Sequence, residues 1–240
     1  MRNVTAVQTQ MRYARFAGFV YLLLIVLFMS GQLTISHIAG SGSFAETTAH
    51  IMANERVYRL ALSVQMLTSV LTVLLAYALY ATVWSVDENL ARMALYWRLG
   101  EAFIGGAASV LDFATLNLRT DPKYLDALGT DKLQAVIGLA HNAGFASFNV
   151  TTTCFAVGST LFFYLFLKSR CIPRVLSAFG IFASVVVLFT SLGNLVLPAY
   201  AHVIQFGWAP IFIVEISTGL WLWIRGVNTG LEIDPIKSTP

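Results

Sequence analysis

Ionisable side chains stand inside apolar stretches of this sequence, where they are costly unless they have a partner or a task. Arg98, Glu101 and Glu215 are each surrounded by mainly apolar residues. An ionisable group at the centre of a membrane costs about 2.5–3.5 kcal/mol on insertion scales. A carboxyl group that stays protonated in an apolar cleft can donate a proton at neutral pH. Glu101 and Glu215 are therefore the candidate catalytic residues, for acid–base chemistry.

The polar residues around Glu101 are spaced as they would be on one face of a helix. Arg98, Glu101, Gly105, Ala108 and Asp112 follow one another at intervals of three and four residues. Residues three and four apart are neighbours on a helix surface. We predict that this face turns into the bundle. Arg98 and Glu101 can pair at i, i+3, and Asp112 is expected near the outer end, where water can solvate it.

Candidate binding residues come from a later apolar stretch as well. His141, Asn142 and Asn149 join Arg98 as predicted binding residues. Glu215 is expected about 14 Å inside the membrane, at a depth similar to that of Glu101. We predict that the two acids line one cavity with Arg98 or His141, and that at least one is protonated at neutral pH. A purely structural ion network is the alternative for the acids, and helix packing is the alternative for His141.

Six long apolar runs must position these residues. Of the 240 residues, 57% are hydrophobic and only 11% are charged, whereas soluble domains carry about 25% charged residues. A bilayer core requires about 20 apolar residues per helix. We predict an all-α, polytopic membrane helix bundle with six transmembrane helices at residues 16–35, 58–84, 91–116, 133–167, 172–197 and 206–224.

Shorter segments between the runs are predicted to lie outside the membrane. Residues 44–54 are expected to form a short amphipathic helix on the surface. Asn54 is expected to cap the helix that follows. Residues 121–132 are expected to form a turn that leads into a helical start.

Lysine and arginine residues set the expected orientation. They are enriched in the segments that would be cytoplasmic with both termini inside (N-in/C-in), and residues 168–174 are the strongest marker. This predicts a cytoplasmic segment 1–15, a single transmembrane domain 16–227 and a polar cytoplasmic tail 228–240, in the inner (cytoplasmic) membrane. The net charge of +3 is small and unclustered, which argues against nucleic-acid binding.

No metal or cofactor is predicted. A di-iron site in a helix bundle uses Glu-x-x-His pairs, but Glu101 is followed three residues later by Ile104. The sequence contains no GxGxxG, P-loop or GxSxG motif. The expected partners are the lipid bilayer and a lipophilic small-molecule substrate, and the sequence specifies no oligomeric state.

Segments along nearly the whole chain together resemble one family. They are ARFAGFVYL at 14–22, YWRLGEA at 96–102, His141, RCIPRVLSAFG at 170–180 and EISTGLWLWIRG at 215–226. In this order they resemble the bacterial membrane proteins of the domain-of-unknown-function 4386 family. The resemblance implies a six-helix inner-membrane protein in which Arg98, Glu101, His141 and Glu215 occupy family-type positions, and it implies no activity.

Three functions compete at this level. Deep paired acids and many aromatic residues are similar to those of small integral-membrane terpene cyclases, by analogy of scale and chemistry alone. An enzyme of this kind would protonate a lipophilic substrate, for example an isoprenoid, because aromatic faces stabilise carbocations. The alternatives are a structural or regulatory membrane subunit without catalysis, and a carrier of a small solute or protons.

Overall fold

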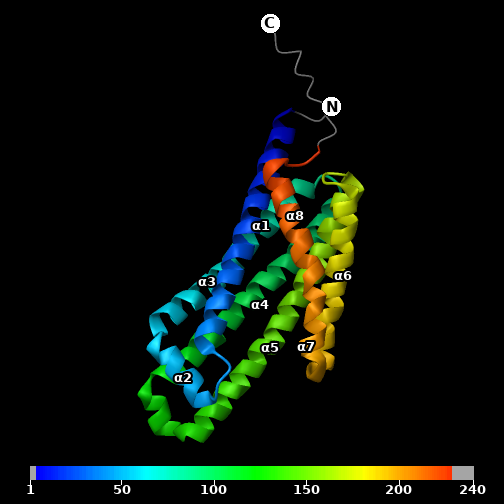
Figure 1. Ribbon diagram of the computed structural model, residues 1–240. Helices are drawn as coiled ribbons and strands as arrows, with labels where there is room; N and C mark the ends of the chain where they lie inside the picture. Colours follow the sequence, from blue (N-terminus) through cyan, green and yellow to red (C-terminus); the bar gives the residue numbers. More distant parts are fainter. Residues whose placement is uncertain (1–3, 229–240) are drawn as a thin grey trace.

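The computed structural model describes residues 4–228, which are almost entirely helical (Figure 1). Eight α-helices follow one another, with a 3₁₀ turn on each side of the seventh. The elements are α1 (Val4–Ala39), α2 (Phe44–Ala53), α3 (Glu55–Val83), α4 (Glu88–Thr120), α5 (Pro122–Ser169), α6 (Arg174–Val196), η1 (Pro198–Tyr200), α7 (Ala201–Ile204), η2 (Gln205–Trp208) and α8 (Ala209–Ile224).

Six of these helices are long and apolar enough to cross a membrane: α1, α3, α4, α5, α6 and α8, the last extended back to Phe206. Helices satisfy their own backbone hydrogen bonds, which lipid cannot do for them. The predicted all-α membrane bundle with six spans is thereby confirmed. Most of the tail predicted at 228–240 lies outside the described residues.

Two of the spans, α1 and α5, extend well past the apolar runs predicted at 16–35 and 133–167. In α5, the 40 residues that follow the break at Gly129, 130–169, measure about 60 Å at 1.5 Å per residue, about twice a bilayer core of about 30 Å. The turn expected at 121–132 is instead the first part of α5. Gly129 interrupts it with φ 72° and ψ 163°, a backbone conformation that is almost restricted to glycine.

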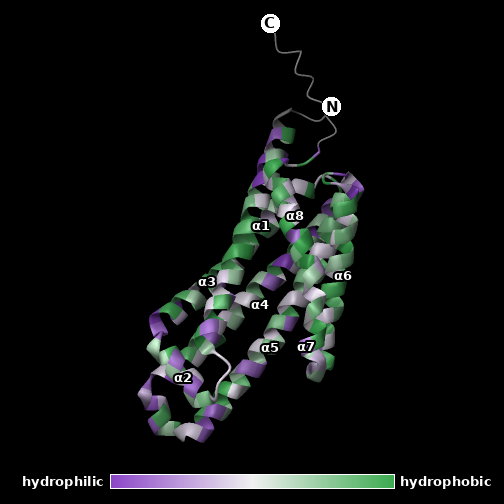
Figure 2. Ribbon diagram, in the orientation of Figure 1, coloured by the Kyte–Doolittle hydropathy of each residue, from purple (hydrophilic) through white to green (hydrophobic). Residues whose placement is uncertain are grey.

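The helices form a ring in which each packs against two neighbours. In ring order they are α1, α3, α4, α5, α6 and α8, and α8 closes the ring against α1. Residues 4 and 228 lie at one end, which we call the terminal end, and α2 lies at the other, the α2 end (Figure 1). Figure 2 shows hydrophilic residues gathered at both ends of the bundle.

Packing differs between the two ends. The main apolar core, which draws residues from all six spans, occupies the terminal half, and a small second core lies around Leu116 at the α2 end. Glycine allows the closest approach between helices: a Cβ on Gly18 of α1 would lie 2.6 Å from the Gly219 carbonyl oxygen of α8. Small residues at such contacts let membrane helices pack backbone to backbone.

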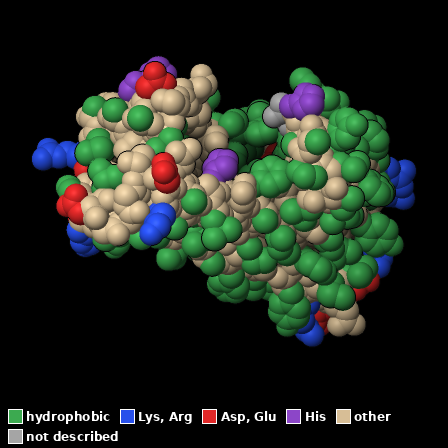
Figure 3. Space-filling model, turned by 90° about the horizontal axis from the view of Figure 1, so that it is seen from below, with side chains coloured by type: hydrophobic (Ala, Val, Ile, Leu, Met, Phe, Trp, Pro, Cys, Tyr) green, Lys and Arg blue, Asp and Glu red, His purple; other side chains and the backbone are tan. Residues whose placement is uncertain are grey.

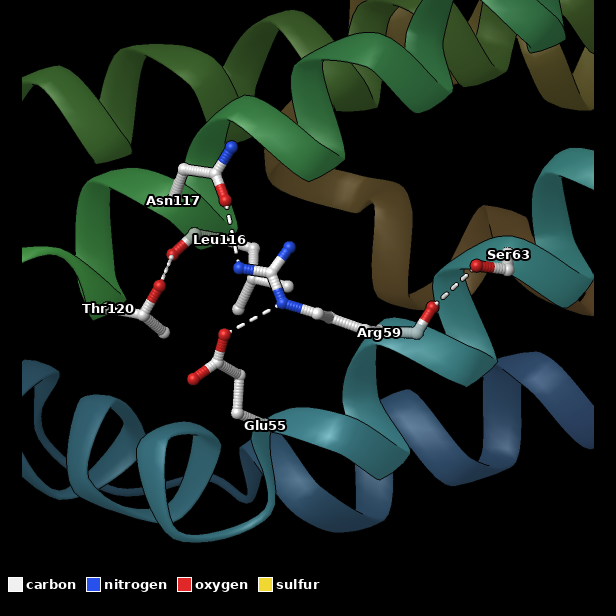
Figure 4. Close-up of polar contacts among 6 residues, drawn as sticks. All are labelled: Glu55, Arg59, Ser63, Leu116, Asn117 and Thr120. Carbon is white, nitrogen blue, oxygen red and sulfur yellow. Dashed lines mark hydrogen bonds and ion pairs between the residues drawn. The ribbon is translucent and has the colours of Figure 1, made fainter.

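Polar contacts fasten the α2 end. Arg59 of α3 pairs with Glu55 at 2.7 Å and donates to Asn117 Oδ1 of α4 at 2.9 Å (Figure 4). Arg119 of α4 donates to Thr48 Oγ1 of α2 at 2.8 Å. These bonds tie α2 and α3 to α4.

Helix α2 begins with a capping box, and Asn54, which follows its end, does not play the predicted role. The Ser43 hydroxyl accepts from the Glu46 N–H, while the Glu46 carboxylate accepts from the Ser43 N–H, which forms a capping box. Asn54 does not cap α3 as predicted. Its side chain donates instead to the His50 carbonyl oxygen and so serves the end of α2.

At the terminal end, loops from separate parts of the chain are joined. Asp87, in the turn before α4, accepts from Lys168 Nζ at 3.0 Å and from the Leu90 N–H at 3.2 Å. These hydrogen bonds hold the pKa of the Asp87 carboxyl below its ordinary value. The Asn228 N–H donates to the Cys171 carbonyl oxygen at 2.9 Å, so the chain after α8 is held against the α5–α6 loop.

Candidate active site

The Arg98–Glu101 pair forms as the spacing predicts. Arg98 Nη1 lies 2.9 Å from Glu101 Oε2, and the two side chains are 2% and 15% exposed. Helix α5 covers the guanidinium: Ser159 Oγ accepts from Nη1 at 3.4 Å, and the Phe155 ring lies 4.8 Å from Cζ. Gly158 makes room, because a Cβ there would lie 2.9 Å from Arg98 Cγ. The buried cation is therefore held by charge, hydrogen bonding and an aromatic face.

Glu215 is held from a different direction. It lies on α8, where the Tyr21 hydroxyl of α1 donates to its Oε1 at 3.0 Å. Tyr21 is only 4% exposed, and a buried tyrosine hydroxyl needs such a partner. The close packing of α1 on α8 at Gly18 and Gly219 positions this bond.

These residues belong to one electrostatic unit, which we call the carboxyl cluster: Tyr21, Arg98, Glu101 and Glu215. Glu215 interacts electrostatically with both Arg98 and Glu101, across the interior of the ring. The two acids have unequal partners, since Glu101 pairs with a guanidinium and Glu215 with a hydroxyl. One cation facing two acids is neutral overall only when one acid carries a proton.

Several polar atoms near these residues have unused hydrogen-bonding capacity. Among the described residues, Arg98 Nε is buried without a hydrogen-bond partner, and Glu101 Oε2 meets the guanidinium as an ion pair without hydrogen-bond alignment. On α8, Thr218 Oγ1 and Trp221 Nε1 are also buried without a partner among the described residues. Buried polar atoms are normally satisfied, so this capacity is available to water or to a bound molecule.

The face at the α2 end is hollowed between two lobes (Figure 3). One lobe carries α2 with the adjoining ends of α3, α4 and α5, and the other carries α6, α7 and α8. Glu101 and Glu215 are both partly exposed rather than buried. A separate open depression of about 670 Å³ lies between Leu33, His37 and Asn54, at the α2 ends of α1 and α3. It does not include the carboxyl cluster.

The predicted binding residues divide into three groups. Arg98 lies in the carboxyl cluster. Asn149 is fully buried and accepts a hydrogen bond from Asn194 Nδ2 of α6 at 3.1 Å. His141 and Asn142 lie exposed on α5, and His141 interacts electrostatically with Asp112 of α4. Thus Arg98 forms an ion pair with Glu101 and interacts electrostatically with Glu215, whereas His141 interacts with Asp112 instead.

The face of α4 that was predicted to turn into the bundle does so over part of its length. Arg98 and Glu101 point into the ring, and Gly105 lies against α3 and α5, because a Cβ there would be 3.3 Å from Ser69 Oγ and 3.6 Å from Thr151 Cγ2. Asp112, further along the same face, is exposed.

Sequence reasoning missed Tyr21 and Ser159. Tyr21 lies in an apolar run, and its partner is 194 positions away, so no local spacing reveals it. The available signal was its hydroxyl in the middle of a predicted span, where a polar group requires a partner. Ser159 lacks even that signal, since serine in a membrane helix can bond to its own backbone.

Metal ligands do not gather in the described part of the chain. No group of three or more His, Cys, Asp or Glu side chains that could hold an ion is found there. Cys154, beside Gly100 and close enough to Glu101 to interact with it, is a single thiol. The arrangement therefore offers carboxyl, guanidinium and phenol groups for chemistry.

Fold and site together define a six-span helical membrane protein with a pair of acids inside the bundle. The profile of the family described as "Domain of unknown function (DUF4386)" matches residues 16–226. The chain belongs to this family. Comparison with curated proteins and with solved structures finds no match.

Proposed function

We propose that the chain is a membrane-embedded acid–base enzyme that protonates a lipophilic, isoprenoid-type substrate. The observation that carries this proposal is the unequal pairing of two partly exposed acids that interact with each other across the bundle. Arg98 forms a direct ion pair with Glu101 at 2.9 Å, whereas Glu215 accepts a hydrogen bond from the Tyr21 hydroxyl and interacts with Arg98 without an ion pair within 4 Å. Glu215 is therefore the acid that is less costly to keep protonated in a low-dielectric site.

In the proposed reaction, Glu215 gives its proton to one carbon of a substrate double bond and becomes a carboxylate. The π electrons form the new C–H bond, and the other carbon becomes a carbocation. Tyr21 and Arg98 stabilise the carboxylate that is left. Loss of a proton from a neighbouring carbon to a carboxylate of the cluster forms a new double bond and restores the acid. Aromatic faces such as that of Phe155 favour cations nearby.

The proposed enzyme lies in the inner (cytoplasmic) membrane with both termini in the cytoplasm. Its transmembrane domain spans residues 16–227, between a cytoplasmic segment 1–15 and the tail 228–240. The terminal end then faces the cytoplasm and the hollow faces the opposite side. Basic residues in the loop at 168–174 support this orientation.

Deuterium incorporation tests the chemistry. Protein in lipid nanodiscs is incubated in D₂O with a panel of unsaturated isoprenoid alcohols, and mass spectrometry counts the deuterium gained at carbon. General acid catalysis contributes about 10²- to 10⁴-fold, so Glu215→Gln should lower incorporation by at least 100-fold. Glu88→Gln, on the exposed terminal turn of α4, should not change it. Full activity of Glu215→Gln, or no incorporation across the panel, refutes the proposal.

A structural subunit is the second candidate, and the enclosure of Arg98 favours it. Ser159 and Phe155 contact the guanidinium, and Gly158 lies against the stem of Arg98, as they would if the task of this side chain were to fix the register of α4 on α5. In that case Glu101→Gln and Glu215→Gln alter thermal stability and leave deuterium incorporation at background in every variant, wild type included.

A further inference from the structure

Two exposed arginines flank the contact between α1 and α8 without an acid to pair with. Arg15 lies on α1 and Arg225 at the end of α8, and within residues 4–228 neither side chain forms an ion pair. Among the same residues, the acids at this terminal end are Asp87 and Glu88, and each already pairs with a basic residue of its own. The described part of the chain therefore leaves the charge of both arginines uncompensated.

The packing of α1 on α8 brings these two arginines to a similar height. A Cβ on Gly18 would lie 2.3 Å from the Trp223 backbone nitrogen, so positions 18 and 223 are side by side. Helix α1 begins and α8 ends at the terminal end (Figure 1). At a rise of 1.5 Å per residue, Arg15 lies about 4.5 Å and Arg225 about 3 Å nearer to that end than this contact. One ligand at this height can therefore meet both side chains.

Two aromatic rings lie next to the arginines on the outer surface. The ring centroids of Phe19 on α1 and Trp223 on α8 are 6.0 Å apart, and the two residues are 45% and 48% exposed. Phe19 follows Arg15 by four residues, which places both on one face of α1. It precedes Tyr21 by two residues, which is about 200° around the helix. Since Tyr21 points into the ring toward Glu215, the aromatic pair faces the bilayer.

Aliphatic side chains continue this surface away from the terminal end. On α8, Ile216 and Leu220 precede Trp223 by seven and three residues. On α1, Val26 follows Phe19 by seven residues. All three aliphatic residues are exposed, and these spacings keep residues on one helix face. The order of cation, aromatic ring and aliphatic chain matches the order of phosphate, glycerol backbone and acyl chain in a membrane lipid.

We propose that this surface, which we call the α1–α8 lipid site, binds one anionic phospholipid. The guanidinium groups of Arg15 and Arg225 donate to the phosphate oxygens, as arginine does with phosphates generally. The rings of Phe19 and Trp223 contact the glycerol region, and the acyl chains lie along the aliphatic surface. A zwitterionic lipid carries an ammonium group that offsets the attraction to the arginines. The site therefore prefers an anionic headgroup, and it does so whether or not the chain is an enzyme.

The α5–α6 loop provides a comparison within the same end of the bundle. Arg170 and Arg174 are also exposed, and neither forms an ion pair among the described residues. They belong to a loop between other helices and not to the α1–α8 contact. Diffuse attraction of lipid to a basic end depends on all four arginines alike, whereas a built site depends on Arg15 and Arg225.

Native mass spectrometry of the full chain in detergent tests the α1–α8 lipid site. The protein is titrated with phosphatidylglycerol or with phosphatidylethanolamine of the same acyl chains, and the affinities for the first bound lipid are compared. Phosphatidylglycerol should bind about tenfold more tightly at low salt. Arg15→Gln/Arg225→Gln should reduce this preference to less than about twofold, whereas Arg170→Gln/Arg174→Gln, which removes the same charge, should retain most of it.

Two further measurements separate the parts of the site. Phe19→Leu/Trp223→Leu leaves the charges in place, so it should weaken the binding of both lipids by the same factor and leave the preference unchanged. Inorganic phosphate at millimolar concentration should not displace bound phosphatidylglycerol, because the acyl chains contribute to its binding.

Three results overturn the proposal. The first is equal affinity of the wild type for the two lipids. The second is an equal loss of preference in the two arginine variants, since diffuse attraction would then be responsible. The third is displacement of the lipid by inorganic phosphate, which would mean a site for a soluble anion. None of these results depends on whether an isoprenoid is turned over.

Discussion

The Arg98→Met substitution should lower the free energy of unfolding by about 3 kcal/mol. Met retains the apolar stem that packs on Phe155 and Gly158 and removes the charge. Breaking a buried ion pair by removing one partner costs about 3–5 kcal/mol, because the other charge is left uncompensated. Glu101 is 15% exposed and can take up a proton from water, so the lower end of this range applies.

The cause is identified by the double variant Arg98→Met/Glu101→Met. If the cost of Arg98→Met comes from the abandoned carboxylate, removal of that carboxylate should recover most of the stability. Well-packed apolar replacements of buried ion pairs are often neutral. The coupling energy between the two substitutions should therefore be about 2 kcal/mol, within the range measured for residues in contact.

Helix α4 provides its own control. Arg92 and Glu88 form an ion pair on the same helix, but their side chains are 45% and 55% exposed, and exposed pairs contribute about 0–1 kcal/mol. Arg92→Met should thus cost less than 1 kcal/mol in the same assay, reversible unfolding in mixed detergent micelles followed by circular dichroism. The reasoning is wrong if Arg98→Met costs no more than Arg92→Met, or if the double variant is as unstable as the sum of the single ones.

Three further outcomes are expected. Gly18→Ala should lower the free energy of unfolding by about 1–3 kcal/mol in thermal melts, because its Cβ would clash with the α8 backbone. Gly138→Ala should not lower it, because a Cβ at position 138 would have no neighbour within 4 Å. Equal effects of the two substitutions would contradict the close contact between α1 and α8. Asp87 has a lowered pKa in the folded state, so its contribution to stability is present above the unfolded value of about 3.9 and is lost as the pH falls through the folded value. Melts between pH 7 and 3 should therefore be less acid-sensitive in Asp87→Asn than in wild type, and identical profiles would exclude Asp87 as a contributor. A fluorescent reporter that matures only in the cytoplasm should be bright when fused after Arg170 and dark after Asp121, and the reverse pattern would overturn the N-in orientation.

What could be predicted from the sequence depended on whether the signal was local. The spans follow from runs of apolar residues, and the Arg98–Glu101 pair follows from an i, i+3 spacing on one helix. The closeness of Glu101 to Glu215 was inferred from similar depth, and the two carboxyls interact electrostatically; that they line one cavity remains a prediction. Depth on two helices is set by the membrane and can be counted along the chain, which is why that inference needed no knowledge of tertiary contacts.

Rotation of one helix against another carries no such local signal. Tyr21 reaches Glu215 because two glycines let α1 and α8 touch, and no feature near Tyr21 in the sequence specifies this. His141 was grouped with the deep residues by counting, yet it lies beside Asp112. The count assumed a straight entry of α5 near residue 133, whereas the helix starts at Pro122 and reaches beyond the shorter helices α6 and α8.

The carboxyl cluster adjoins the main apolar core, to which Tyr21 belongs, and this explains how the proposed reaction would combine reactivity with access. On the terminal side, fully buried alanines and phenylalanines exclude water, and a low dielectric strengthens every charge interaction of Arg98. On the α2 side, the ring opens where α6 and α8 end. A site deeper in the packed half would be unreachable, and one further into the hollow would have its charges screened by water. At the edge of this core, a buried guanidinium could hold one acid ionised while the second stays within reach of the proposed substrate.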